Sequence, residues 1–92
     1  MGLVHSNMGD YPKALSYYEK ALEIQKHSLP SNHPDLGKSY NNIGSVYSNM
    51  GDYPKARSFY ERAVEIGQHS LPPNHPHLQE WKRNLDNVKK KM

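Results

Sequence analysis

The segment Gly9–Ala14, with the sequence GDYPKA, returns unchanged as Gly51–Ala56, which is 51 − 9 = 42 residues further along the chain. The two copies continue to match up to the tripeptides Asn32–Pro34 and Asn74–Pro76. Self-similarity at a period of this length is typical of repeat proteins, in which each structural unit packs only on its neighbours. The chain is therefore predicted to consist of stacked copies of one unit.

The repeated segment opens a predicted helix. Pro12 and Pro54 are predicted to lie at the first position of their helices. The amide of a first helical residue has no partner within the helix, so proline loses no hydrogen bond there, and its fixed φ angle already suits a helix. Leu-Pro steps at 29–30 and 71–72 stop the helix. In between, apolar residues recur at helical spacing, and the aromatic ones are predicted to pack in the core rather than to stack on nucleic-acid bases. They are Ala14, Tyr17, Tyr18, Ala21, Leu22 and Ile24 in the first copy, and Ala56, Phe59, Tyr60, Ala63, Val64 and Ile66 in the second.

The other helix of the unit is predicted from Pro34 to about Gly51. His33 and its copy His75 precede prolines and are expected to serve as helix starts. Gly51 is well placed to end the helix, since glycine readily adopts the left-handed conformation found after helix C-termini. No stretch alternates polar and apolar residues with period two, so no strands are predicted.

These residues resemble a known family. An aromatic residue, a large apolar residue and a glycine are followed by a tyrosine, a glycine in the turn and then small residues. Their spacing resembles the signature of the tetratricopeptide repeat. The residues that carry this resemblance are Tyr40, Ile43, Gly44, Tyr47, Gly51, Tyr53, Ala56, Tyr60 and Ala63. The unit exceeds the usual 34 residues. With Asn32–Asp35 and Tyr40–Gly44 it resembles the long repeats of kinesin light chains and related proteins. The resemblance implies an all-α fold of antiparallel helix-turn-helix repeats, stacked as a short right-handed α-solenoid.

The repeat also predicts how the chain is divided. Residues 1–9 correspond to a truncated first helix of repeat 1, residues 10–33 to its second helix and loop, and residues 34–75 to a complete repeat 2. Residues 76–92 depart from the pattern after Leu78, and an apolar stripe of Leu78, Trp81, Leu85 and Val88 has polar residues around it. One apolar face with water on the others is expected of a C-terminal capping helix.

Composition narrows the function classes. The 92 residues include no cysteine, which excludes disulfides, thiolate zinc sites and cysteine nucleophiles. No apolar stretch could span a membrane, the N-terminal residues lack the features of a signal peptide, and a cytoplasmic, intracellular location is expected. The net charge of +3 owes much to Lys89–Lys91, interpreted as a solvated helix end.

Chemistry-bearing residues do not form a catalytic pattern. The six histidines include repeat copies one unit apart, which cannot converge on a metal ion, and only His75 and His77 could chelate weakly. The paired glutamates at 19/23 and 61/65 lie beside basic residues and are interpreted as exposed charge. No nucleophile signature or phosphate-binding loop is present. The chain is therefore expected to be no enzyme and to hold no cofactor and no metal.

The resemblance further implies a binding surface, because in tetratricopeptide arrays the first helix of each pair lines the concave face. Side-chain amides there could hold the backbone of an extended peptide, since they donate and accept hydrogen bonds. Asn42 is the foremost candidate, although it could instead bond a neighbouring helix. The expected site comprises Lys38, Asn41, Asn42, Ser45, Asn49, Asn84 and Asn87.

The leading hypothesis is a protein-interaction module that binds a short peptide or a partner domain on this concave face. The alternative is a structural repeat fragment that self-associates, for instance as a homodimer, through helix faces that lack a neighbour. A weak contact of Lys82, Arg83 and Lys89–Lys91 with nucleic acid or a membrane is a third hypothesis. Neither nucleic acid nor a membrane is the expected partner.

Overall fold

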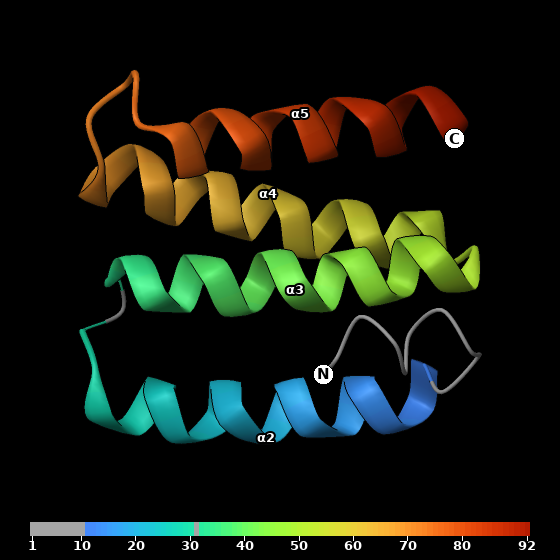
Figure 1. Cartoon of the computed structure of the whole chain (residues 1–92), viewed down its shortest axis with the longest axis horizontal. Helices are drawn as coiled ribbons and strands as arrows, with labels where there is room; N and C mark the ends of the chain where they lie inside the picture. Colours follow the sequence, from blue (N-terminus) through green and yellow to red (C-terminus); the bar gives the residue numbers. More distant parts are fainter. Residues whose placement is uncertain (1–10, 31) are drawn as a thin grey trace.

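The computed structural model describes residues 11–30 and 32–92, and these residues form four helices. Helix α2 spans Tyr11–Ser28, α3 spans Pro34–Met50, α4 spans Tyr53–Ser70 and α5 spans Pro76–Lys91. Successive helices run antiparallel and lie side by side in chain order (Figure 1). The described residues contain no strand, so the predicted all-α helical repeat is confirmed. The predicted truncated helix at residues 1–9 lies outside the described residues.

The helix starts follow local chemistry. His33 and His75 are the N-caps of α3 and α5, as expected, and in each the imidazole Nδ1 accepts a hydrogen bond from the backbone amide two residues later at 3.1 Å. Asp52 caps α4 by accepting from the Lys55 amide. A cap side chain satisfies one of the amides that a helix leaves without an internal partner, which is why these residues begin helices.

Helices α3 and α4 end in two different backbone conformations. Gly51 follows α3 with φ 86°, the left-handed conformation that favours glycine. The amides of Gly51 and Asp52 then donate to the carbonyls of Ser48 and Tyr47, which satisfies the end of the helix. Helix α4 ends instead at extended Leu71, whose amide donates to the Gly67 carbonyl at 2.8 Å before Pro72 prevents continuation.

The core lies between successive helices. Between α3 and α4, the ring of Phe59 stacks on Tyr47 with centroids 5.5 Å apart and lies 6.0 Å from Tyr40. Ile43 and Ala56 are completely buried in the same cluster. The prediction that the aromatic residues of the second unit pack in the core is thus confirmed.

Trp81 fixes α5 to the helices before it. Its side chain is 1% exposed and belongs to a second cluster with Ala63, Val64 and Leu78. The indole lies against two glycines, Gly37 on α3 and Gly67 on α4, which leave room for the ring because they lack a Cβ atom. The helices can therefore approach closely at this end of the molecule.

Apolar side chains of α2 are more exposed than their copies in α4, and the core prediction for Tyr17 is wrong. Tyr17 is 72% exposed and Ile24 is 61% exposed, whereas Ile66, the copy of Ile24, is 3% exposed. The copies in α4 are covered by α3, since Phe59 stacks on Tyr47 and Ile66 lies beside Gly37. For α2, the residue equivalent to Tyr47 lies outside the described residues.

Candidate functional site

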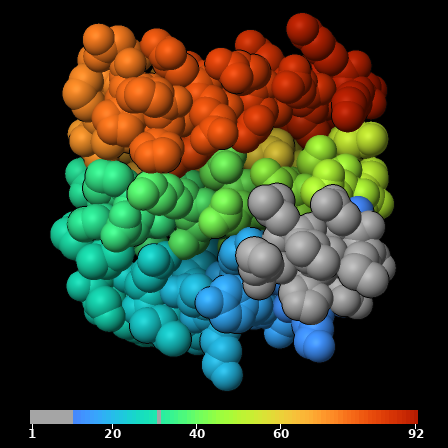
Figure 2. Space-filling view, in the orientation of Figure 1, coloured from blue at the N-terminus to red at the C-terminus, as the bar shows by residue number. Residues whose placement is uncertain are grey.

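The residues of the expected site lie on α3 and α5. Asn42, Ser45 and Asn49 follow Lys38 by four, seven and eleven residues, which places all four along one face of α3. Figure 2 views the molecule from a side on which α3 and α5 cover most of α4. The side chains of Lys38, Asn42, Asn49 and Asn87 are exposed, while those of Asn41, Ser45 and Asn84 are half-buried. The sequence-predicted site thus separates into an exposed set and a half-buried set.

The half-buried asparagines bind each other. Asn84 on α5 donates through Nδ2 to Oδ1 of Asn41 on α3, at 2.9 Å. This bond joins α3 to α5 across 43 residues of sequence. Each amide keeps one group, the Asn41 Nδ2 and the Asn84 Oδ1, that has no hydrogen-bond partner among the described residues. Both residues therefore hold the two helices in register and still offer a donor and an acceptor.

Ser45 is held by the helix behind it. The hydroxyl of Tyr60 on α4 donates to the Ser45 Oγ at 3.0 Å. Burial raises the pKa of Tyr60, and the hydrogen bond to Ser45 lowers that pKa by a smaller amount. Tyr60 is therefore neutral and able to donate at physiological pH, and Ser45 connects α3 to α4.

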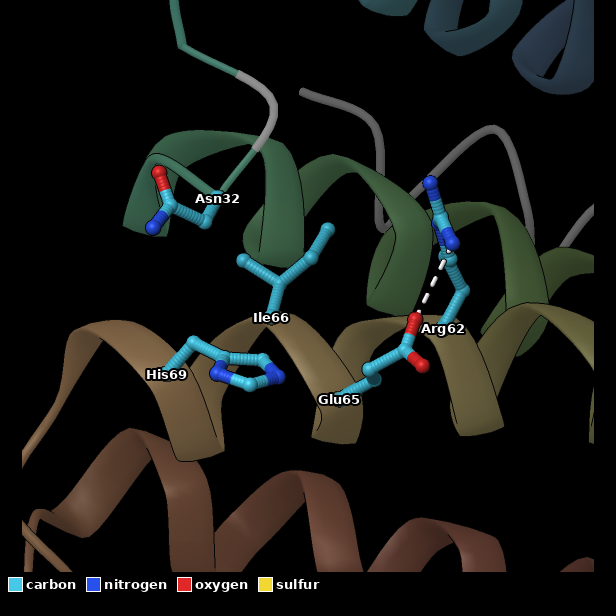
Figure 3. A pocket seen from close by; sticks show the side chains of 5 residues that line it. All are labelled: Asn32, Arg62, Glu65, Ile66 and His69. Atoms are coloured by element: carbon cyan, nitrogen blue, oxygen red, sulfur yellow. Dashed lines mark hydrogen bonds and ion pairs between the residues drawn. The ribbon is translucent and has the colours of Figure 1, made fainter.

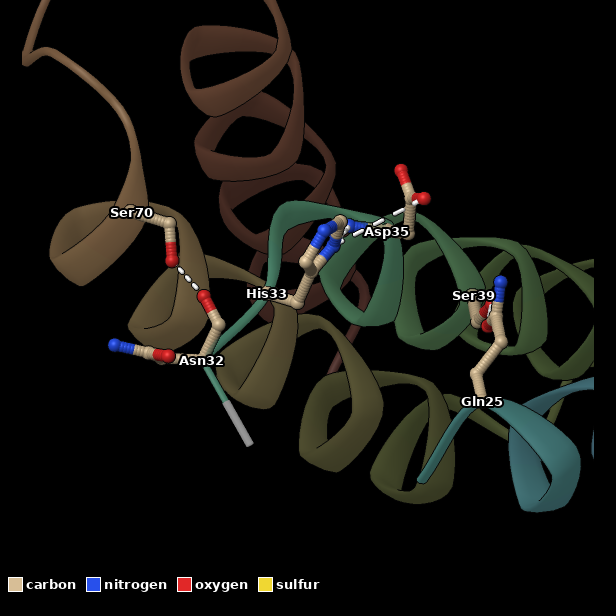
Figure 4. A network of polar contacts seen from close by, with 6 residues as sticks. All are labelled: Gln25, Asn32, His33, Asp35, Ser39 and Ser70. Carbon is tan, nitrogen blue, oxygen red and sulfur yellow. Dashed lines mark hydrogen bonds and ion pairs between the residues drawn. The ribbon is translucent and has the colours of Figure 1, made fainter. Parts of the chain in front are cut away.

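A polar network at the turn end of the units was not predicted from the sequence (Figure 4). Ser39 on α3 donates to the Gln25 side chain of α2, and Ser70 on α4 donates to the Asn32 carbonyl in the α2–α3 loop. Both bonds join residues of different elements, so only the packed structure reveals them. Their donors and acceptors tie neighbouring elements together, and they identify no ligand.

A shallow hollow of about 170 Å³ lies on α4 and the α2–α3 loop, with Ile66 inside it (Figure 3). Arg62 and Glu65, both exposed, pair across its rim at 3.0 Å, which confirms that Glu65 is a surface charge. The sequence repeats part of this lining, because Lys20, Glu23 and Ile24 are the copies of Arg62, Glu65 and Ile66 in the first unit. The lining charges compensate each other, and no nucleophile with an adjacent base is formed; the lining residues are Asn32, Arg62, Glu65, Ile66 and His69.

The described residues were also compared with the requirements of a metal site and of a membrane-spanning helix. Across residues 11–30 and 32–92, no group of three histidine, aspartate or glutamate side chains is arranged to hold a metal ion. Over the same residues, no helix combines the length and the apolarity that a membrane crossing requires.

Comparison with known proteins agrees with this architecture. The family model described as tetratricopeptide repeat matches residues 1–69, which is three quarters of the chain. No curated protein matches the chain.

Among solved structures, the chain is similar to the nearly identical TPR-like repeats of a Podospora anserina protein provisionally named a kinesin light chain. The TM-score is 0.89 at 22% identity, over 98% of this chain and 43% of that one. A second crystal structure, of a variant of the same protein, gives a TM-score of 0.88 at 22% identity, over 98% and 42%. The chain thus spans less than half the length of these structures, and the likeness concerns the fold. From the family match and the helical repeat, we conclude that the chain belongs to the tetratricopeptide repeat family.

Proposed function

We propose that the chain binds an extended peptide, or a segment of a partner domain, on the face formed by α3 and α5. Tetratricopeptide repeats are in general protein-interaction scaffolds without catalytic activity. The observation that carries the proposal is the exposed row of Lys38, Asn42 and Asn49 on α3 beside Asn87 on α5. Exposed amides pair with both the N–H and the C=O groups of a peptide backbone, whatever its sequence.

The Asn41–Asn84 bond supports this proposal. It fixes the separation of α3 and α5, so the binding surface is already formed before a ligand arrives. Binding would then cost less conformational entropy of the protein. Lys38 and Arg83 are exposed on the two helices and add positive charge. A ligand of neutral or acidic character is therefore favoured over a basic one.

Replacing Asn42 with alanine is expected to weaken peptide binding about three- to tenfold, the effect of losing one or two hydrogen bonds. Peptides are first selected from a displayed library at physiological salt, and their affinities for both proteins are measured by calorimetry. Asn74→Ala, at an exposed position of the α4–α5 loop and outside the row of Lys38, Asn42, Asn49 and Asn87, is the matched control and should bind as the wild type does. Equal affinity of the Asn42→Ala protein and the wild type would exclude this face as the binding site.

The division of the chain is likewise a proposal: residues 34–75 form a complete repeat, and α5 caps it. On α3, Gly37, Tyr40, Gly44 and Tyr47 contact α4 or α5. The residues 42 positions later are all polar and exposed, namely Gln79, Lys82, Asp86 and Lys89. A further helix packed on α5 in the manner of α4 on α3 would bury these charges, which supports the role of a cap.

A second candidate function is self-association through the exposed apolar positions of α2. Tyr17 and Ile24 are favoured for this role because their copies in α4 are covered by another helix. A second copy of the chain could cover them across a two-fold axis.

We expect the sedimentation coefficient to rise with protein concentration if this association occurs, and the Tyr17→Ser/Ile24→Ser protein to remain monomeric. Lys20→Ser/Glu23→Ser, which changes exposed polar positions of the same helix, serves as the control and should behave as the wild type. A wild-type chain that stays monomeric over the whole concentration series would eliminate this candidate.

A further inference from the structure

One end of the molecule gathers basic side chains from two helices. Helix α3 ends at Met50, α4 begins at Tyr53 and α5 ends at Lys91, and the antiparallel order of the helices brings these three points to the same end (Figure 1). Lys55 in the first turn of α4 and Lys89–Lys91 in the last turn of α5 are all exposed there. We call these four lysines the basic end.

The formal charge of the chain is concentrated on one of these helices. Helix α5 contains five basic and two acidic residues, so its formal charge is 5 − 2 = +3. The rest of the chain has 12 − 5 = 7 basic and 9 − 2 = 7 acidic residues and is therefore neutral. The net charge of +3 thus belongs to α5, and three of the five cations of this helix lie in the basic end.

The lysines of the basic end have no acidic partner. Among residues 11–30 and 32–92, no carboxylate oxygen lies within 4.0 Å of any of their ammonium groups. On α4, by contrast, Arg57 and Arg62 pair with glutamates at 3.1 and 3.0 Å. Asp52 and Asp86 are the acidic residues nearest to these lysines in sequence, and Asp52 accepts the Lys55 amide as the cap of α4. The positive charge of the basic end therefore remains free to meet a ligand.

Two of these ammonium groups are held over tyrosine rings. The Nζ atom of Lys91 lies 5.7 Å from the centre of the Tyr53 ring, and that of Lys55 lies 5.4 Å from the centre of the Tyr47 ring. The contacts are attractive because the face of an aromatic ring carries partial negative charge. They restrict the two lysine side chains, so a ligand that binds them would remove less rotamer freedom.

Helix stability alone does not account for this arrangement. Cations in the last turn of α5 suit the negative end of its helix dipole. Lys55, however, lies in the first turn of α4, at the positive end of that dipole, where a cation is unfavourable. At the same end of the molecule, Met50 is 43% exposed. An adaptable apolar side chain close to unpaired cations suits a ligand that combines acidic and apolar residues.

We propose that the basic end binds an acidic segment of a partner protein, whose carboxylates face Lys55, Lys90 and Lys91 and whose apolar side chain contacts Met50. The opposite charges of the segment and the basic end provide the attraction and guide the encounter. The basic end lies at the helix ends, whereas the proposed peptide site runs along the exposed row of α3 and α5. This proposal therefore goes beyond the proposed function and does not rest on it.

A phosphate surface matches the basic end less well than an acidic protein segment does. A nucleic-acid backbone or an anionic bilayer presents continuous negative charge, which would meet Asp52 and Asp86 as well as the lysines. Trp81, the single tryptophan, is buried and cannot stack on a base. A protein segment can instead place separate carboxylates at the lysines alone.

The test uses a synthetic peptide with the sequence Glu-Glu-Leu-Glu-Glu-Leu, titrated into the 92-residue chain at physiological salt while NMR spectra of the backbone amides are recorded. The shift changes should concentrate at Tyr53, at Lys55 and in the last turn of α5. Lys90→Gln/Lys91→Gln should weaken binding about three- to tenfold, the effect of losing two exposed ion pairs. Lys55→Gln changes a different helix and should weaken binding about two- to threefold.

Lys82→Gln/Arg83→Gln is the matched control, because it removes the same charge from the same helix. Lys82 precedes Lys90 and Arg83 precedes Lys91 by eight residues, which is about 12 Å along a helix and exceeds the Debye length of about 8 Å at physiological salt. This control should therefore bind the peptide within about twofold of the wild type. Circular dichroism of each variant checks that the helices are intact.

The proposal is overturned if the wild type does not bind the acidic peptide, or if the two double variants weaken binding equally. Equal binding of Gln-Gln-Leu-Gln-Gln-Leu would also overturn it, as would tighter binding of phosphatidylserine vesicles or duplex DNA than of the acidic peptide. Asn42→Ala, which tests the row on α3 and α5, should bind the acidic peptide as the wild type does. Failure here is therefore distinct from failure of the proposed function.

Discussion

Replacing Trp81 with alanine is expected to lower the free energy of unfolding by about 3–5 kcal/mol, the usual cost of truncating a large buried aromatic side chain. The indole is 1% exposed and contacts α3 at Gly37 and α4 at Gly67, so its removal leaves a cavity where three helices meet. Because Gly37 and Gly67 carry no side chains, neither can turn inward to fill that space. Chemical unfolding followed by circular dichroism measures the loss.

Tyr17→Ala is the matched control, since it also truncates an aromatic helix residue but at a position that is 72% exposed. Its effect should stay within about 0.5 kcal/mol of zero, as for most surface substitutions. Two variants of similar stability would mean that Trp81 does not join α5 to the other helices. A selective loss at Trp81 would identify the contacts of α5 with α3 and α4 as a main source of stability.

Local signals made much of the fold predictable. Proline lies in the first turn of every described helix, and in α3, α4 and α5 a histidine or aspartate shortly before it supplies the cap atom. Helix starts therefore depend on adjacent residues, and Gly51 likewise ends α3 through its own backbone conformation. The 42-residue period then gives the order of the helices, because equal sequences adopt equal structures.

The candidate site was less predictable, because its contacts depend on packing between distant residues. The sequence placed Asn41 and Asn84 on the same surface, and their hydrogen bond follows only from the distance and rotation between α3 and α5. Ser45 is predicted as a ligand contact, and the sequence does not reveal that its Oγ accepts a hydrogen bond from the Tyr60 hydroxyl. The prediction for Tyr17 failed for a similar reason. Its helical spacing is that of a core residue, but its exposure depends on which helix lies against it.

Replacing Gly37 with alanine should destabilise the chain by about 1–3 kcal/mol, the range found when extra atoms are forced into a packed core. A Cβ atom at this position would lie 2.6 Å from both Cη2 and Cζ3 of Trp81. A Cβ atom at Gly67 would likewise stand only 3.0 Å from Cε3 and Cζ3 of the same ring, so the indole has little space in which to move. Helix propensity alone predicts the opposite sign, since alanine is favoured over glycine by about 1 kcal/mol inside a helix.

The sign of the change therefore distinguishes close helix approach from simple helix formation. Ser58→Ala, at an exposed position of α4, adds alanine without a packing conflict and should alter stability by less than about 0.5 kcal/mol. Combining Gly37→Ala with Trp81→Ala supplies the decisive comparison, because the added methyl group then has space. In that background the Gly37→Ala change should become neutral or stabilising, as expected for two residues in direct contact. A Gly37→Ala protein that is more stable than the wild type would show that Trp81 does not occupy the space beside α3.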